Sequence, residues 1–270
     1  MSDSSNNVKN PALSILVVDD DELNQRMMRL LLKRDGHSVE CVSNGLEAYN
    51  AVTTQSFDMV LMDLQMPVMD GVEASRRIRE WEGDNTHIFI VALTASYLPE
   101  RGRELFEAGI DNYMAKPFDV DHLRHILQYG IENRKAQQVG DKQPETAVIS
   151  GEQEFDYQLG IQRVGGDRET YNELFKDFVD ELPEKLENMR SCYYIKKDMD
   201  GLYRAAHNLK GVSANLGALQ LSEHAGRLEK QVSESYTEQI ESILNDISIA
   251  SDRLKESSLK FFIGNEAKAS

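Results

Sequence analysis

The stretch from Asp58 to Gly71, DMVLMDLQMPVMDG, sets the strongest limit on the fold of this chain. It predicts a buried apolar strand over residues 59–62 that places one carboxylate, Asp63, at its carboxyl end. Pro67 and Gly71 then interrupt the chain before a helix can begin. A lone Asp in such a place usually only ends a strand or caps a turn. The rest of the chain must decide between that interpretation and a chemical role.

Short apolar runs alternate with segments of helical periodicity on both sides of this stretch. Besides 59–62, the sequence predicts strands at residues 15–18, 39–42, 88–93 and 112–115. It predicts helices at residues 22–35, 46–53, 72–81, 100–108 and 119–133. Five strand–helix units in succession indicate a doubly wound α/β fold, a parallel sheet with helices on both faces. Ligands of such sheets bind beyond the carboxyl ends of the strands.

The run D-x-x-x-x-D-x-x-M-P-x-M-D-G resembles the phosphoacceptor segment of two-component receiver domains. In that family the residue at the position of Asp63 becomes an aspartyl phosphate. Thr94 in V-A-L-T-A and Lys116 in Y-M-A-K-P-F also match the family's pattern. The resemblance implies a flavodoxin-like sheet with the strand order 2-1-3-4-5. In that order Asp19 and Asp20, which follow the first strand, lie at the same rim as Asp63.

Three carboxylates at one rim repel one another, and a hard divalent cation with oxygen ligands relieves that repulsion. Mg2+ fits best, because it keeps several waters and can bridge carboxylates to a phosphoryl oxygen. The resemblance implies Asp20 and Asp63 as direct ligands and the backbone carbonyl of Gln65 as a third. It implies that Asp19 acts mainly through water. Asp21 is expected at the N-terminus of a helix rather than on the metal.

The same resemblance assigns further roles at this rim. The Lys116 ammonium and the Thr94 hydroxyl would neutralise phosphoryl oxygens, since phosphoryl transfer depends on positioning and electrostatics. Tyr113 would change rotamer with Thr94 and alter the face made by the fourth helix, fifth strand and fifth helix; the alternative is a half-buried strand aromatic. Gln65 and Ser96 would line the path of water to the acyl phosphate. The peptide bond after Lys116 is expected to be cis.

A different pattern follows residues 135–154, a polar stretch with Gly and Pro breakers that predicts an interdomain linker. Beyond it there is no strand signal, and apolar residues between 171 and 182 recur at helical spacing. Pro183 is expected to kink or divide this helix, which could otherwise run to about residue 197. Other helices are expected at residues 155–159, 200–215, 219–233 and 237–260. Antiparallel helices with short connections predict an all-α four-helix bundle.

His207 stands out in this half, in R-A-A-H-N-L-K-G-V-S-A-N-L-G-A. Helical spacing turns Leu202 and Leu209 away from it, so the imidazole is predicted to face solvent. Gly211 would leave room beside it for another protein, and Lys210 could offer charge to a phosphoryl group. The segment resembles the A-H-x-L-K-G motif of histidine-phosphotransfer domains, as do the preceding G-G-D-R-E-x-Y and F-V-D-E-L-P segments. The resemblance implies that a neutral His207 carries a phosphoryl group on nitrogen.

These features predict a phosphorelay protein, with a disordered leader at residues 1–12, a receiver domain at 13–134, the linker, and a histidine-phosphotransfer domain at 155–263. Asp63 would accept a phosphoryl group from a phosphohistidine donor, and His207 would carry it to or from a receiver Asp. The chain would promote its own phosphorylation and dephosphorylation at Asp63, but it lacks the G-x-G nucleotide box of a kinase. The donor would therefore be a separate histidine kinase or hybrid kinase, and the acceptor the receiver of another response regulator.

Two alternatives of other classes stay open. The tandem could be a phosphate sink or reverse-flow module, which a short lifetime of phosphorylated Asp63 would favour. It could also be a binding module whose phosphorylated receiver docks on a target that is not a receiver. The tandem also resembles the C-terminal half of hybrid sensor kinases, although Met1 followed by a polar leader favours a free-standing protein.

Composition excludes other classes. A formal net charge of −16 argues against direct DNA binding, which needs a basic footprint. No apolar run approaches the roughly 18 to 20 residues that span a bilayer, and the N-terminus lacks the apolar core of a signal peptide. Cys41 and Cys192 have neither metal-binding nor redox spacing, which suits a reducing compartment. The sequence therefore predicts a cytoplasmic protein without membrane insertion.

Overall fold

A computed structural model describes residues 11–83, 87–94, 102–133, 155–234 and 238–269. Five parallel strands and five helices alternate in the first half, in the sheet order β2-β1-β3-β4-β5. This order confirms the predicted doubly wound sheet. The elements are β1 Ser14–Val18, α1 Glu22–Arg34, β2 Ser38–Val42, α2 Gly45–Thr54, β3 Met59–Asp63, α3 Gly71–Glu82, β4 Phe89–Thr94, α4 Gly102–Glu107, β5 Asn112–Ala115 and α5 Val120–Asn133.

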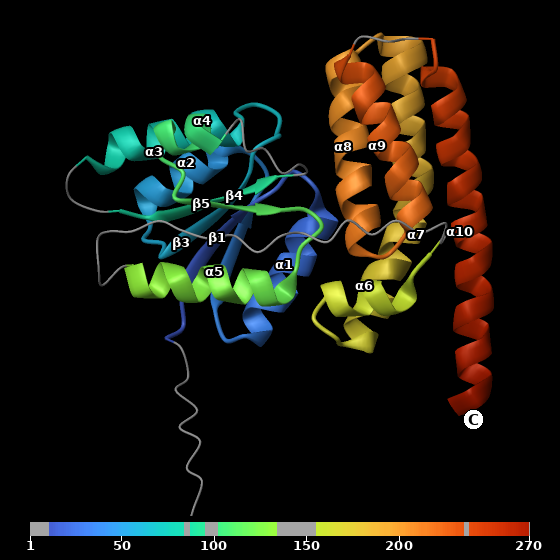
Figure 1. Ribbon diagram of the computed structural model, residues 1–270, viewed down its shortest axis with the longest axis horizontal. Coiled ribbons are helices and arrows are strands. Elements are labelled where there is room, and N and C mark those ends of the chain that lie inside the picture. The colour runs from blue at the N-terminus through green and yellow to red at the C-terminus, as the bar shows by residue number, and fades with distance from the viewer. Residues whose placement is uncertain (1–10, 84–86, 95–101, 134–154, 235–237, 270) are drawn as a thin grey trace, which may run out of the picture.

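Helices cover both faces of the sheet, with α1 and α5 on one side and α2, α3 and α4 on the other (Figure 1). Successive strand side chains point to opposite faces. Ile15 and Leu61 therefore pack with α1 and α5, whereas Leu16 and Met62 pack with α2 and α3. Every residue of β3 is buried, because both faces of this central strand are covered. Burying each apolar side chain of β3 stabilises the fold by about 1.5–3 kcal/mol. These buried side chains fix the strand, and Asp63 at its end is therefore held on rigid backbone.

Helix α1 begins where the acidic triplet ends. Asp21 is its N-cap, and the carboxylate accepts hydrogen bonds from the backbone N–H groups of Leu23 and Asn24. The predicted helix-terminal position of Asp21 is therefore confirmed. The Lys116–Pro117 peptide bond is cis, as expected.

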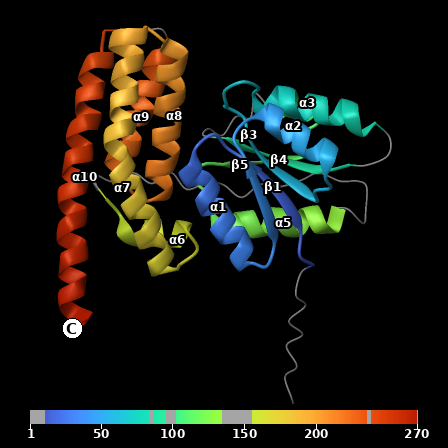
Figure 2. The same ribbon diagram turned by 180° about the vertical axis from the view of Figure 1, so that it is seen from behind.

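The second half is helical in its described part, with α6 Tyr157–Arg163, α7 Arg168–Arg190, a π-helical segment η1 Ser191–Lys196, α8 Met199–Asn215, α9 Leu219–Ser233 and α10 Ile240–Ala269. Helices α7 to α10 pack side by side as a bundle (Figures 1 and 2). Pro183 does not divide α7, which runs unbroken to Arg190. The fully buried Tyr171, Phe178 and Leu182 pack one face of α7 into the core. This packing offsets the free energy lost because proline cannot donate a backbone hydrogen bond.

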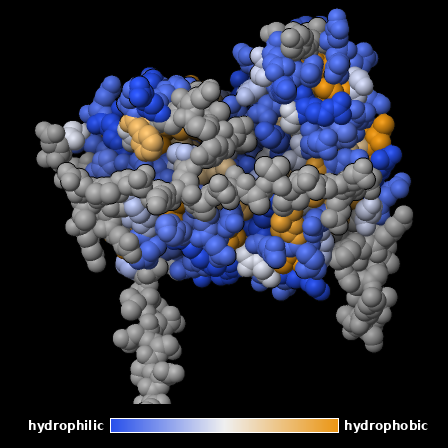
Figure 3. Space-filling model, viewed as in Figure 1, coloured by the Kyte–Doolittle hydropathy of each residue, from blue (hydrophilic) through white to orange (hydrophobic). Residues whose placement is uncertain are grey.

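The two halves lie against each other, with α1 and α8 at their junction (Figures 1 and 2). The apolar cluster beneath α1 and α5 is continuous with the core of the bundle. The face seen in Figure 3 is mostly hydrophilic, in keeping with the acidic composition. Among the described residues, no helix has both the length and the apolar character needed to span a bilayer. The predicted linker, most of the predicted leader and Ser96 lie outside the described residues.

Candidate functional site

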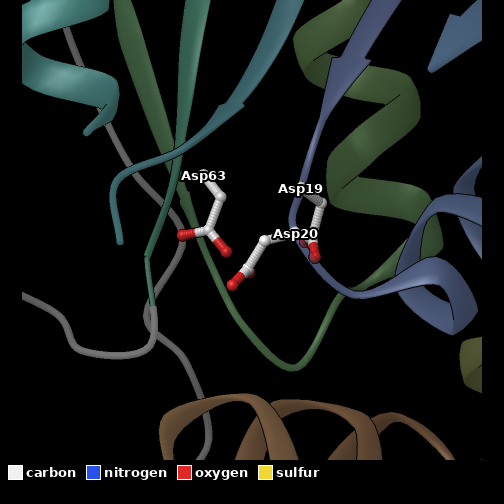
Figure 4. A group of neighbouring side chains, drawn as sticks. All are labelled: Asp19, Asp20 and Asp63. Atoms are coloured by element: carbon white, nitrogen blue, oxygen red, sulfur yellow. The ribbon is translucent and has the colours of Figure 1, made fainter. Parts of the chain in front are cut away.

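Three carboxylates meet beyond the carboxyl ends of β1 and β3. Asp19 and Asp20 follow β1, and Asp63 is the last residue of β3. One oxygen from each lies within 4.8 Å of the others, and Figure 4 shows the three side chains gathered around one space. Asp19 and Asp63 are buried, whereas Asp20 is partly exposed. Because parallel strands end at one edge of a sheet, the fold brings these residues together as predicted.

Lys116 joins two of these acids from the end of β5. Its Nζ donates hydrogen bonds to Asp19 Oδ2 at 2.8 Å and to Asp63 Oδ2 at 2.6 Å, inside a side-chain environment that is almost closed to solvent. Burial alone would lower the pKa of Lys116, but the carboxylates of Asp19 and Asp63 outweigh it and raise that pKa. The ammonium therefore stays charged. Burial raises the pKa of Asp19 to about 6, and Asp63 adds to the effect while Lys116 opposes it.

Asp20 has one oxygen that is suited to a cation. Its Oδ2 accepts a hydrogen bond from Asn208 Nδ2 at 3.1 Å. Its Oδ1 is buried and has no hydrogen-bond partner within the described part of the chain. A buried carboxylate oxygen without a donor costs free energy, which a metal ion would recover. Together with the oxygens of Asp19 and Asp63, this atom completes a donor set that fits a hard divalent cation.

A cavity of about 560 Å³ opens beside Asp63 and is shared by both halves of the chain. The sheet contributes Asp63 and Thr94, the latter buried at the end of β4. The bundle contributes Tyr203, His207 and Glu229. The two residues predicted to carry phosphoryl groups thus line the same cavity.

His207 is held firmly on α8. Its Nδ1 lies 2.7 Å from Glu229 Oε1, and the ring of Tyr203 stacks on it with centroids 6.4 Å apart. Lys210 Nζ donates to the other oxygen of Glu229 at 3.0 Å. The imidazole is only 4% exposed, so the prediction that it faces solvent is wrong. Helical periodicity turned His207 away from the leucine core of its own bundle, but it could not show that the receiver half packs over that face.

Gly211 illustrates the same packing. A Cβ atom built on it would lie 3.7 Å from Lys116 Cδ, so the small residue faces the lysine of the other half. The predicted room for a protein beside His207 is therefore present, and the chain's own receiver half fills it.

The partner of Nδ1 defines the nucleophilic nitrogen of His207. Burial would raise the pKa of Glu229, but its interactions with His207 and with the Lys210 ammonium outweigh this and lower that pKa. Glu229 is therefore a carboxylate at neutral pH, and a carboxylate only accepts hydrogen bonds. The neutral imidazole carries its proton on Nδ1, which leaves the lone pair of Nε2 available.

Further polar contacts cross the junction between the halves. Gln65 Nε2 donates to Tyr203 Oη at 2.9 Å, and the backbone N–H of Phe118 donates to Asn215 Oδ1 at 2.9 Å. The backbone N–H of Gln65 also donates to Asp63 Oδ1 at 3.0 Å. The shared site thus depends on residues that sequence reasoning did not single out, which are Tyr203, Asn208, Asn215 and Glu229. Only Tyr203 had a local signal, because it lies four residues before His207 and so shares its helix face.

Tyr113 is half-buried on β5 and packs against the cluster beneath α2 and α3. This position agrees with the simpler interpretation of a half-buried strand aromatic. Its change of rotamer stays a prediction.

Comparisons with known proteins bear on both halves. Residues 15–128 match the family model of the response regulator receiver domain, and residues 173–256 match that of the Hpt domain. The chain is 30% identical over 244 residues to the sensor protein GacS of Pseudomonas syringae pv. syringae, covering 89% of this chain and 27% of that protein. It is 25% identical over 222 residues to the signal transduction histidine-protein kinase BarA of Escherichia coli K12, covering 82% of this chain and 24% of that protein.

The chain therefore spans about a quarter of the length of these curated relatives. Among solved structures, the receiver domain of the sensor histidine kinase PA1611 of Pseudomonas aeruginosa PAO1, with magnesium in its active-site cleft, is 36% identical. That match covers 45% of this chain and 99% of that domain, with a TM-score of 0.41. By the two family matches, the chain contains a response regulator receiver domain followed by an Hpt domain, the histidine-phosphotransfer module of two-component phosphorelays.

Proposed function

We propose that this chain is a phosphorelay module in which Asp63 and His207 exchange a phosphoryl group directly, within one molecule. The observation that carries the proposal is the cavity that both residues line. Phosphoryl transfer needs donor and acceptor in line at close range, and holding them together supplies much of the acceleration. The proposed domain limits are 13–134 for the receiver and 155–263 for the Hpt domain.

In the proposed step, the lone pair of His207 Nε2 attacks phosphorus and forms a P–N bond. The bond between phosphorus and the Asp63 oxygen breaks, and its electron pair returns to the carboxylate. Positive charge develops on the imidazole and is stabilised by Glu229, which lies 2.7 Å from Nδ1. The reverse step restores the aspartyl phosphate, and both linkages are energy-rich, so transfer can run in either direction.

Cationic and hydroxyl groups of the receiver stabilise the phosphoryl oxygens in this proposal. Lys116 already touches Asp63, and Thr94 lines the cavity beside it. In the Hpt domain, the Lys210 ammonium donates a hydrogen bond to Glu229. Lys210 would therefore support the transfer by holding Glu229 in place. Gly211 supports transfer by allowing close approach of the two domains.

Asp20 and Asp63 would hold Mg2+ directly, with the backbone carbonyl of Gln65 as a third ligand and Asp19 acting through water. The unpartnered Oδ1 of Asp20 supports this assignment. When bound, Mg2+ neutralises charge on the phosphoryl oxygens. Tyr113 would report phosphorylation to the face formed by α4, β5 and α5.

The proposed donor to Asp63 is a histidine kinase or hybrid kinase, and the proposed acceptor from His207 is the receiver of another response regulator. Similarity to a sensor protein and to a signal transduction histidine-protein kinase supports this placement. A cytoplasmic location is part of the proposal, and the free thiols of Cys41 and Cys192 suit it. The shared cavity favours transfer between Asp63 and His207 over a sink that drains a kinase through Asp63 alone or a phosphorylation-switched binding module, neither of which needs His207 beside Asp63. Reverse flow from His207 to Asp63 would use the same cavity, and the lifetime of phosphorylated Asp63 distinguishes it from forward relay.

The test is to phosphorylate the full chain with a small acyl phosphate and Mg2+, and to map the label by its acid and base stability. We expect base-stable, acid-labile label on His207 in the wild type, and none there in Asp63→Ala. His207→Gln should retain label on Asp63 alone. The yield on His207 should not depend on protein concentration. Label confined to Asp63 in the wild type would contradict the proposal and favour the sink or binding module.

A further inference from the structure

Asp21, the third acid of the triplet, has no role in the proposed transfer, and yet it is only 5% exposed. Its Oδ1 caps α1 by accepting from the backbone N–H groups of Leu23 at 3.0 Å and Asn24 at 3.2 Å. Its Oδ2 accepts from Lys185 Nζ at 2.7 Å. Lys185 lies on α7 of the Hpt domain, 164 residues away in sequence. One carboxylate therefore serves both a helix of the receiver and a cation of the other domain.

This ion pair is shielded from water. The side chain of Asp21 is 4% exposed and that of Lys185 26%. Burial alone would lower the pKa of Lys185, but Asp21 and the more exposed Glu181 outweigh it and raise that pKa, so the lysine stays charged. A shielded pair of this kind resists screening by salt.

A second charge contact between the domains is more open to solvent. Arg26 of α1 pairs with Glu173 and Asp177 of α7, and their side chains are between 37% and 62% exposed. Exposed pairs contribute little to association because water competes for both charges. Among the described charge pairs at this junction, the contact between Lys185 and Asp21 is thus the one that solvent weakens least.

We propose that Lys185 is a specificity-determining residue of the Hpt domain, which selects receivers that carry a carboxylate at the position of Asp21. The inference rests on the proposed transfer between Asp63 and His207. A receiver with a neutral residue there would leave the Lys185 ammonium partly desolvated when it docks, with the more exposed Glu181 of its own helix as the remaining partner among the contacts described. Removing one partner of a shielded pair costs more than the pair contributes, and that penalty separates right from wrong partners.

The chain's own receiver satisfies this requirement and covers His207. A downstream receiver must displace it and occupy the same face, so it meets Lys185 as well. The partners that His207 serves are therefore receivers with a third acid directly after the acidic pair that ends their first strand.

The test measures the rate at which label moves from Asp63 to His207 in the full chain, in Lys185→Met, Asp21→Asn and the double variant. Asn is as good an N-cap as Asp, so Asp21→Asn removes the charge and keeps the start of α1. Each single variant should slow transfer by on the order of tenfold. The double variant should be no slower than the slower single variant, because removing both charges leaves no buried charge without its partner across the junction. Lys185→Arg should keep most of the rate.

Lys176→Met is the matched control, since Lys176 lies on the same helix and pairs only with the exposed Asp180 in the contacts described. It should transfer at the wild-type rate. Single variants within twofold of wild type, or a double variant whose loss is the product of the two single losses, would overturn the inference. Labelling of Asp63 in the His207→Gln background should be equal with and without Lys185→Met. A wild type that labels Asp63 but never His207 would instead refute the proposed function, and the inference with it.

Discussion

Replacing Glu229 with Gln should slow transfer from Asp63 to His207 by about fivefold to tenfold. Gln keeps the size of the side chain and an oxygen that can accept the Nδ1 proton, but it removes the negative charge. Hydrogen bonds to charged groups contribute about 1.5–3 kcal/mol and neutral ones about 0.5–1.5 kcal/mol, a difference of about 1–1.5 kcal/mol. At 1.4 kcal/mol for each factor of ten, this difference gives the expected change in rate.

The burial of this pair supports using the whole difference of about 1–1.5 kcal/mol between a charged and a neutral hydrogen bond. His207 is 4% exposed and the side chain of Glu229 13%, so little water replaces the lost charge. The assay follows acid-labile label on His207 after single-turnover phosphorylation of Asp63. Glu223→Gln is the control, because Glu223 lies exposed on the same helix, α9, and should leave the rate unchanged. A Glu229→Gln rate within twofold of wild type would refute the idea that this carboxylate stabilises charge on the imidazole.

Three further predictions follow from other contacts. Mg2+ at ten times its Kd should raise the free energy of unfolding of the wild type by about 1.4 kcal/mol, as measured by urea unfolding. The same Mg2+ concentration should stabilise Asp20→Asn much less. Equal stabilisation of both proteins would mean that the ion binds elsewhere. Gly211→Leu should slow transfer by on the order of tenfold, because the larger side chain overpacks against Lys116. Gly211→Ala should change the rate little. Equal rates in the wild type and both variants would refute the close approach of the two domains at that helix face. Burial lowers the pKa of His37 from its usual 6.5, and its Nδ1 accepts from the Leu13 N–H at 3.2 Å, so the unfolded chain binds the proton first as pH falls. The stability that His37 contributes is thus present above pH 6.5 and is lost as the pH falls below it. His37→Gln should therefore flatten the decline in unfolding free energy between pH 7 and about 5. An unchanged slope in the variant would contradict this prediction.

Local sequence determined the receiver fold well. The alternation of apolar runs and helical periodicity placed five strands near their observed positions. The signal was strongest for β3 and β4, which are buried along their whole length, whereas the edge strands β2 and β5 are largely half-buried or exposed. The apolar run that begins at Met59 predicted a strand, and Asp63 directly follows that run. Its position at the rim of the sheet could therefore be predicted from sequence. Pro183 shows the limit of such rules, because tertiary packing of α7 overrides the local cost of proline.

The environment of His207 was decided only by tertiary structure. Periodicity within α8 tells which side of the helix faces the core of its own bundle, but the opposite side here meets a different domain. Glu229 lies 22 residues from His207, and Lys185 lies 164 residues from Asp21. Neither pairing has a local signature, because a charged side chain on an amphipathic helix looks the same in sequence whether it faces water or a partner. The sequence by itself determined which residues can carry a phosphoryl group, whereas the packing of two domains decided which groups surround them.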